Sequence, residues 1–214
     1  QHPVALSPEE ASRLEGTVAL VGRHYPFRER FVRELTDYPL RVWGPGWEHV
    51  RYDRQAIFSG ELWRLLTAHL IHVDFTHLGW NLAGLALVAW LFGREFRALE
   101  WALILAISTI AVDLGFLLLE PQLEWYVGFS GVLHGLMAAG LCAWLWRSPD
   151  SLTALVATVF AAKLAWEHFA GPLPFTAGSL DVPVVHQSHS YGAVGGLIAA
   201  LLLLWRQRGA GRSL

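Results

Sequence analysis

The sequence predicts an all-α membrane protein, in which a bundle of five transmembrane helices follows an N-terminal segment of a different kind. Hydrophobic residues make up 54% of the 214 residues and charged residues only 16%, whereas soluble domains carry about 25% charged residues. Five apolar stretches approach the roughly 20 residues that cross a bilayer; they cover about 77–93, 99–119, 129–146, 151–170 and 185–205. The lipid bilayer is therefore the expected surrounding, and no basic stripe indicates nucleic acid as a partner.

The first 50 residues do not fit this pattern. The stretch 27–41 is rich in arginine and acidic residues, so it cannot cross a membrane. Earlier, the run Ser7-Pro8-Glu9-Glu10 is typical of a helix start. We therefore divide the chain into a charged, partly helical N-terminal segment (1–50), a membrane domain (51–205) and a basic cytoplasmic tail (206–214).

Arginines mark alternate ends of the predicted spans. The loops 120–128 and 171–184 contain no Lys or Arg, whereas arginines follow the first, third and fifth spans at Arg94, Arg97, Arg147, Arg206 and Arg208. The positive-inside rule places the arginine-bearing ends in the cytoplasm. The first, third and fifth spans then all begin at the outer face.

Polar residues gather where these three spans begin. His77 and Asn81 open the first span, Ser130 the third and His189 the fifth, so at 1.5 Å per residue all four lie about 5–10 Å below the outer boundary. Polar side chains in lipid are costly and usually face the interior of a bundle. A single shared site explains these four residues together.

The residue types at this depth predict nucleophilic catalysis. Serine becomes a good nucleophile when a base accepts its proton, and histidine does so best near neutral pH. We therefore assign Ser130 as the nucleophile and His189, rather than the neighbouring His186, as the base. The oxyanion donors would be the Asn81 amide, the His77 imidazole and the Ser130 N–H. No acid is evident at a matching outer position, so the prediction is a Ser–His dyad with no cofactor or metal.

Several motifs resemble those of rhomboid intramembrane serine proteases. They are Gly128-x-Ser130-Gly131, His77-x-x-x-Asn81 and His189-x-x-Gly192-x-x-x-Gly196, with Gly60-Glu61-Leu62-Trp63-Arg64 ahead of the first span. Arg51-Tyr52-Asp53-Arg54, the run 123–135 and Lys163-Leu164-x-Trp166-Glu167 look more closely like rhombosortase, a short bacterial rhomboid branch associated with proteins that carry a Gly-Gly C-terminal sorting tail.

This resemblance implies a rhomboid-like fold and an endopeptidase that cleaves a transmembrane or C-terminal anchor segment near the outer face. Its substrates would be membrane proteins with C-terminal anchor segments. The protein would lie in a bacterial inner membrane, with its active site opening to the periplasmic side. His72, Gly128 and Gly131 are candidates for supporting the site.

The chain departs from the rhomboid pattern in two places. A further span is expected before Arg51, where this chain has the charged segment. Many rhomboids also carry a tyrosine one turn after the serine, stacked beneath the catalytic histidine, and His134 stands there in this chain. We expect His134 to support the site.

Three other ionisable residues fall within predicted spans. Lys163 and Glu167 are four residues apart, so they can pair on one helix face; alternatively they bind the substrate tail. Asp113 lies in the outer half of its span without an evident partner. We leave it outside the catalytic assignment.

Two other classes of function stay open at this point. The chain has ten histidines, and His69, His72, His77, His186 and His189 could build the metal site of a His-rich membrane metalloenzyme. The zinc-protease signature His-Glu-x-x-His is absent, however, and few carboxylates accompany these histidines. A non-catalytic rhomboid-like binding protein is the other alternative, although it has no need for both Ser130 and His189.

Overall fold

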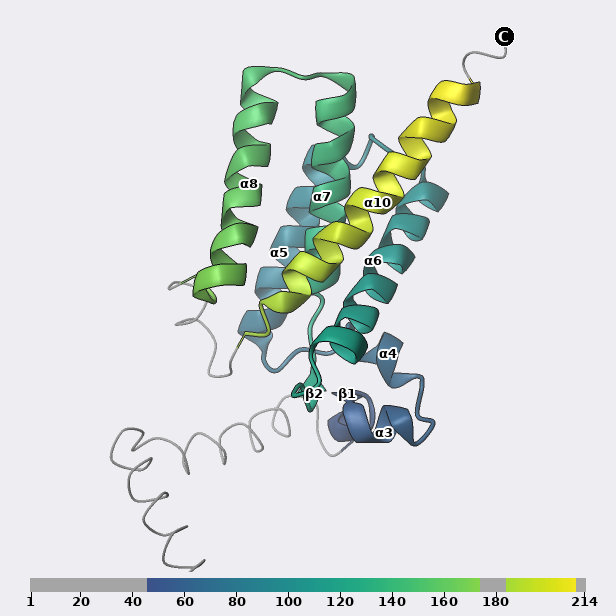
Figure 1. Ribbon diagram of the computed structural model, residues 1–214, viewed down its shortest axis with the longest axis vertical. Helices are drawn as coiled ribbons and strands as arrows, with labels where there is room; N and C mark the ends of the chain where they lie inside the picture. Colours follow the sequence, from purple (N-terminus) through teal and green to yellow (C-terminus); the bar gives the residue numbers. More distant parts are fainter. Residues whose placement is uncertain (1–45, 174–183, 211–214) are drawn as a thin grey trace, which may run out of the picture. The chain divides into compact units, whose positions relative to one another are not determined.

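The computed structural model describes residues 46–173 and 184–210 (Figure 1). A bundle of long helices dominates it: α5 (Phe75–Phe92), α6 (Ala98–Leu119), α7 (Ser130–Arg147), α8 (Ser151–Ala170) and α10 (Gln187–Ala210). The predicted helical membrane bundle is confirmed, and the helices coincide with the predicted stretches within two residues, except that α10 continues past residue 205. Most of the predicted N-terminal segment 1–50 and the end of the tail lie outside the described residues.

Among the described residues, α5, α6 and α10 are long and apolar enough to cross a membrane by length and composition alone. Helices α7 and α8 are at least as long as α5 but less apolar, and they fall outside that criterion. Many outward-facing side chains of the bundle are nevertheless large and apolar; Leu99, Trp90 and Phe169 are at least 80% exposed. Such a surface suits lipid rather than water.

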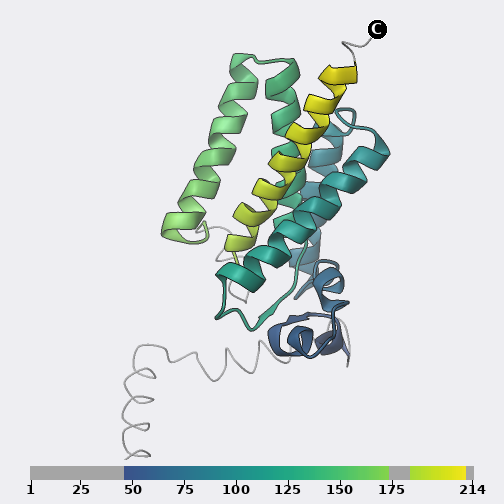
Figure 2. The ribbon, with the colours of Figure 1, turned by 45° about the vertical axis from the view of Figure 1, so that its right-hand side comes forward.

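Helix α7 lies at the centre of the bundle. It packs against α5, α6, α8 and α10, and α10 crosses it diagonally while also lying along α6 (Figures 1 and 2). Helix α8 stands at the edge, beside α7 and α10. The apolar core between the central helices includes Phe92, Ile104 and Leu204, which are almost completely buried.

Glycines bring α7 and α10 into backbone contact. A Cβ atom added at Gly192 would collide with the carbonyl oxygen of Gly131, and one added at Gly196 would collide with that of Gly135. Small residues allow membrane helices to approach this closely. The two contacts are one helical turn apart, so they fix both the distance and the register of the helices.

A small cap of short helices and strands lies at the end of the bundle where α5, α7 and α10 begin and α6 ends. It contains η1 (Trp47–His49), β1 (Tyr52–Asp53), α3 (Arg54–Phe58), α4 (Arg64–Thr67) and β2 (Trp125–Tyr126). Strands β1 and β2 pair antiparallel, with Tyr52 opposite Tyr126. The Arg54 guanidinium donates hydrogen bonds to three carbonyl groups at the C-terminal end of α6, those of Phe116, Leu117 and Glu120. The cap thus anchors the segment before α7 to the end of α6.

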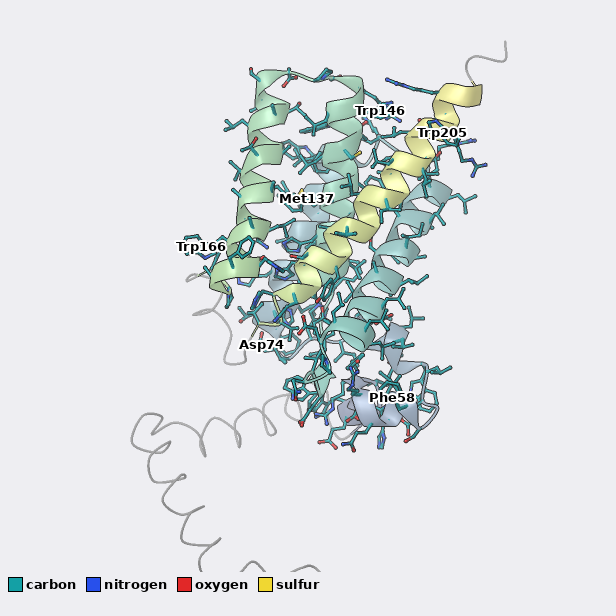
Figure 3. The ribbon with its side chains drawn as sticks, viewed as in Figure 1. Phe58, Asp74, Met137, Trp146, Trp166 and Trp205 are labelled. Carbon is teal, nitrogen blue, oxygen red and sulfur yellow. The ribbon has the colours of Figure 1, made fainter. Side chains whose placement is uncertain are left out.

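Tryptophans lie toward both ends of the bundle. Trp146 and Trp205 lie near the end where α7 and α10 finish, whereas Trp166 lies at the other end with Asp74 (Figure 3). Trp205 and Trp166 are more than half exposed. Tryptophan is enriched at membrane–water interfaces, so these side chains indicate where the two boundaries of the bilayer lie.

Candidate active site

Ser130 is the first residue of α7, and the turn before it is held from two sides. The Gly128 N–H donates to the Ala68 carbonyl oxygen at 2.9 Å, and the Tyr126 hydroxyl donates to the Gly128 carbonyl oxygen at 2.7 Å. Gly128 has a φ of +127°, and a Cβ there would lie only 2.6 Å from the His77 ring. Glycine is therefore required at this position, both for its backbone conformation and for the approach of His77.

His189 reaches Ser130 from the first turn of α10. Its Nε2 lies 3.0 Å from the Ser130 Oγ, and its side chain is buried. The α7–α10 glycine contacts begin at Gly192, three residues after His189, so the backbone crossing positions the imidazole directly. It is His189 rather than His186 that contacts the serine hydroxyl.

An acid also contacts His189, contrary to the prediction from the sequence. Oε2 of Glu167, on α8, lies 2.9 Å from Nδ1 of His189, and Glu167 is only 1% exposed. The expectation that no acid lies at the matching depth is wrong because α8 ends at the same face where α7 and α10 begin. Residue 167, one turn before that end, is then level with Ser130.

Lys163 and His134 complete this cluster. The Lys163 ammonium donates to Oε2 of Glu167 at 2.7 Å, so the predicted pair forms, and it also contacts Nε2 of His134. The ring of His134 stacks on that of His189, with centroids 4.0 Å apart and planes 16° apart. His134 therefore occupies the place beneath the histidine that the rhomboid resemblance assigns to a tyrosine.

The hydrogen bonds imply the tautomers of both histidines. Nδ1 of His134 lies 2.7 Å from the Ser130 carbonyl oxygen, which can only accept, so Nδ1 carries the proton and Nε2 accepts from Lys163. The Glu167 carboxylate likewise accepts from Nδ1–H of His189. The lone pair of the His189 Nε2 then faces the Ser130 hydroxyl, as a general base requires.

The first two turns of α5 contain two further predicted residues, His77 and Asn81, and the His77 ring lies against Gly128, two residues before the serine. The Asp74 side chain caps α5 and accepts from the His77 N–H at 2.6 Å. The buried Asn81 amide donates to the His77 carbonyl oxygen at 2.9 Å, which leaves its second N–H available. Nδ1 of His77 is buried and makes no hydrogen bond within the described residues. The His72 ring stands edge-on against that of His77, with centroids 4.9 Å apart.

Asp113 has a partner that the sequence did not reveal. Its carboxylate lies 3.1 Å from Nε2 of His69, whose ring packs against Tyr126. This pair supports the segment that holds Gly128, and it does not contact the serine. Burial raises the pKa of Tyr126 to about 12, so its hydroxyl remains a hydrogen-bond donor to the turn across the physiological range.

The donor set that could hold a metal ion already surrounds a cation. Three possible metal-ligand atoms, one each from His134, Glu167 and His189, lie within 4.8 Å of one another. The Lys163 ammonium lies within 3.3 Å of all three residues, and a divalent cation there would face strong repulsion. These residues therefore do not fit a metal site.

The sequence model of one protein family, the Rhomboid domain, matches residues 59–206 of this chain. The chain belongs to the rhomboid family. It is also similar to the "Putative rhomboid protease YdcA" of Bacillus subtilis (strain 168), with 27% identity over 154 residues, which cover 71% of this chain and 72% of that protein. No solved structure matches the chain. As a rhomboid with large apolar helices it is an integral membrane protein, and its family is one of intramembrane proteases. The matched residues include Ser130, His134, Lys163, Glu167 and His189.

Proposed function

We propose that this rhomboid is an intramembrane serine endopeptidase in which Ser130 is the nucleophile and His189 the general base. The observation that carries the proposal is the 3.0 Å contact between the Ser130 Oγ and the His189 Nε2 inside a membrane bundle. His189 takes the hydroxyl proton as Oγ attacks the scissile carbonyl carbon, and it then passes the proton to the leaving amine. Water subsequently hydrolyses the acyl-enzyme with His189 again acting as the base.

The negative charge of the tetrahedral intermediate needs hydrogen-bond donors. The first N–H groups of α7 have no acceptor within the helix, and in the proposal the Ser130 N–H is one of the donors. The unused N–H of the Asn81 amide and the imidazole of His77 are the side-chain donors of the proposal. Their support is the position of His77 against Gly128, two residues before the nucleophile.

The substrate of the proposal is a membrane protein with an anchor segment at its C-terminus. Helical carbonyl groups are already hydrogen-bonded, so the cut requires a segment that unwinds. Glycine costs about 1 kcal/mol relative to alanine in a helix, and a Gly-Gly pair would both unwind the chain and fit a crowded site. The support for such a sorting tail is the similarity of the 123–135 and 163–167 motifs to rhombosortase.

The proposed setting is the inner membrane of a bacterium, with the site open to the periplasmic side. Ser130, His189 and the cap lie at one end of the bundle, and Arg147 and Arg208 lie at the other. Among the described residues the cap has three arginines (Arg51, Arg54 and Arg64) and the other end has five (Arg94, Arg97, Arg147, Arg206 and Arg208), so the positive-inside rule favours the cytoplasm for that other, more arginine-rich end. The tryptophans Trp146 and Trp205 near the arginine end, and Trp166 near the serine end, agree with two interfaces at these levels (Figure 3).

The first test is covalent labelling of the purified protein by a fluorophosphonate, together with cleavage of an anchored substrate in liposomes. Ser130→Ala should abolish both, and His189→Ala should abolish cleavage. The double variant should be no worse than either single one, because the two groups act as a unit. Full cleavage by either single variant would refute the assignment. Binding of a tail without labelling or cleavage would indicate the non-catalytic alternative.

The second test addresses the sorting tail. Replacing Gly-Gly by Val-Val in a tail substrate should block processing, because β-branched side chains are too bulky for the site. Mass spectrometry of the released product should locate the new C-terminus at or next to the glycines. A cut deep in the apolar segment, or normal processing of the Val-Val tail, would refute the tail preference and leave the protease proposal intact.

A further inference from the structure

We propose that Glu167 is the acid of a Ser130–His189–Glu167 triad, a positioning residue that α8 contributes to the site. This inference rests on the proposed protease function. The carboxylate meets the geometric requirement for the role, because its Oε2 is 2.9 Å from Nδ1 of His189 while the opposite ring nitrogen is 3.0 Å from the Ser130 Oγ. The three groups form one hydrogen-bonded chain across α8, α10 and α7.

Hydrogen bonds to one carboxylate oxygen of Glu167 direct it toward His189, while the other oxygen, Oε1, is buried and accepts no hydrogen bond within the described residues. Its Oε2 accepts from both His189 and Lys163, and the carboxylate is almost fully buried. Lys163 in turn contacts Nε2 of His134, whose other nitrogen donates to the Ser130 carbonyl oxygen. Lys163 therefore connects the acid to the imidazole that stacks beneath His189. A buried group held by several partners is positioned for one task.

The function of the acid follows from the charge that His189 acquires. When His189 accepts the serine proton it becomes an imidazolium, and the Glu167 carboxylate stabilises that cation and holds Nδ1–H in place. The proton stays on His189 until the leaving amine takes it. Glu167 is the negatively charged group that faces His189. The other titratable neighbours of His189 are basic or neutral: His77 on α5, His134 on α7, Lys163 on α8 and His186 just before α10.

The alternative role for Glu167 is merely to neutralise Lys163, and four variants separate the two roles. Glu167→Gln should lower kcat by about 10²- to 10⁴-fold with KM little changed, and Glu167→Asp, which keeps the carboxylate, should be faster than Glu167→Gln. Lys163→Met should cause a much smaller loss because the bond between Glu167 and His189 remains. The double variant Lys163→Met/Glu167→Gln should be as slow as Glu167→Gln alone. Recovery of activity in the double variant would overturn the proposal.

The pH–rate profile provides a readout that a purely structural role would not change. Without the anion the imidazolium is less favourable, so Glu167→Gln should move the acidic limb of kcat/KM to lower pH. Lys163→Met removes a cation from the same surroundings and should move that limb to higher pH. Charges at these distances predict shifts of about one pH unit or more. Shifts in the same direction, or no shift in Glu167→Gln, would overturn the proposal.

Failure of this inference is distinguishable from failure of the protease function. If the unmodified protein is neither labelled by the fluorophosphonate nor able to cleave, the function itself fails. If it is active and Glu167→Gln matches it in kcat and in pH profile, only the triad fails. Thermal unfolding in detergent, followed by tryptophan fluorescence, identifies any variant that is misfolded. Glu167→Asp then serves as the comparison, because it keeps the charge.

Discussion

The glycine contact between α7 and α10 predicts how strongly the site depends on helix packing. In Gly192→Ala, the new methyl group would occupy the position of the Gly131 carbonyl oxygen. Restoring an ordinary C···O contact of about 3.3 Å requires the helices to separate by roughly 1 Å or more. Such a shift would lengthen the present 3.0 Å contact between the Ser130 Oγ and the His189 Nε2 beyond hydrogen-bonding range. A misplacement of about 1 Å costs about 10² in rate.

The matched control is Gly79→Ala, also within a helix. A Cβ at Gly79 meets nothing within 4 Å, so this variant should cleave as the unmodified protein does. The assay compares kcat for an anchored substrate in liposomes with the rate of fluorophosphonate labelling, and Gly192→Ala should slow both. Equal rates for Gly192→Ala and Gly79→Ala would refute the idea that backbone contact sets the distance between nucleophile and base.

Three further predictions follow from the site. Asn81→Ala and His77→Ala should each lower kcat by about 10²- to 10³-fold, the usual cost of removing an oxyanion donor, while serine labelling remains detectable; unchanged kcat in both would exclude them as donors. A chelator should leave cleavage unchanged, whereas inhibition that added metal reverses would favour a metalloenzyme. Burial lowers the pKa of His72 from its ordinary 6.5, so the folded protein favours the neutral ring. The stability that His72 contributes is therefore present above pH 6.5 and is lost as the pH falls toward the folded-state pKa. His72→Gln should therefore reduce the loss of thermal stability below pH 6.5, and an unchanged loss would contradict this.

The sequence predicted the helices well because their lengths suit a bilayer and their apolar runs contain few ionisable residues. The start of α5 differs by two residues because the Asp74 side chain, rather than the first apolar residue, caps the helix. Helix α10 extends past residue 205 because backbone hydrogen bonds continue through the basic residues that leave the lipid. The β1–β2 pair was not predicted, because each strand is two residues long and carries no periodicity.

The sequence predicted how deep in the membrane each site residue lies. It did not predict which neighbouring helix each side chain faces, because that depends on the rotation of each helix about its axis. Arginine placement alone put Ser130 and His189 at one level. The pairing of Lys163 with Glu167 followed from their spacing on one helix, yet no local pattern shows which neighbouring helix they face. The topology did contain a usable signal, since residue 167 lies near the outer end of its span. Likewise, the partner of Asp113 is His69, which precedes the first span and is brought close only by the folded cap.

The α7–α10 crossing also determines how this protein responds to the mechanics of the bilayer. Helices accommodate a change in hydrocarbon thickness by tilting, and two helices in backbone contact at Gly131–Gly192 and Gly135–Gly196 would tilt about this one-turn region as a pivot. Ser130 and His189 lie within one turn of the pivot, whereas the hydrogen bond between Arg147 and Gln207 lies about four turns away. A thicker or thinner membrane would strain that distant contact first and leave the serine–histidine distance nearly constant. Bilayer thickness should then alter how a substrate is presented while the serine itself stays reactive.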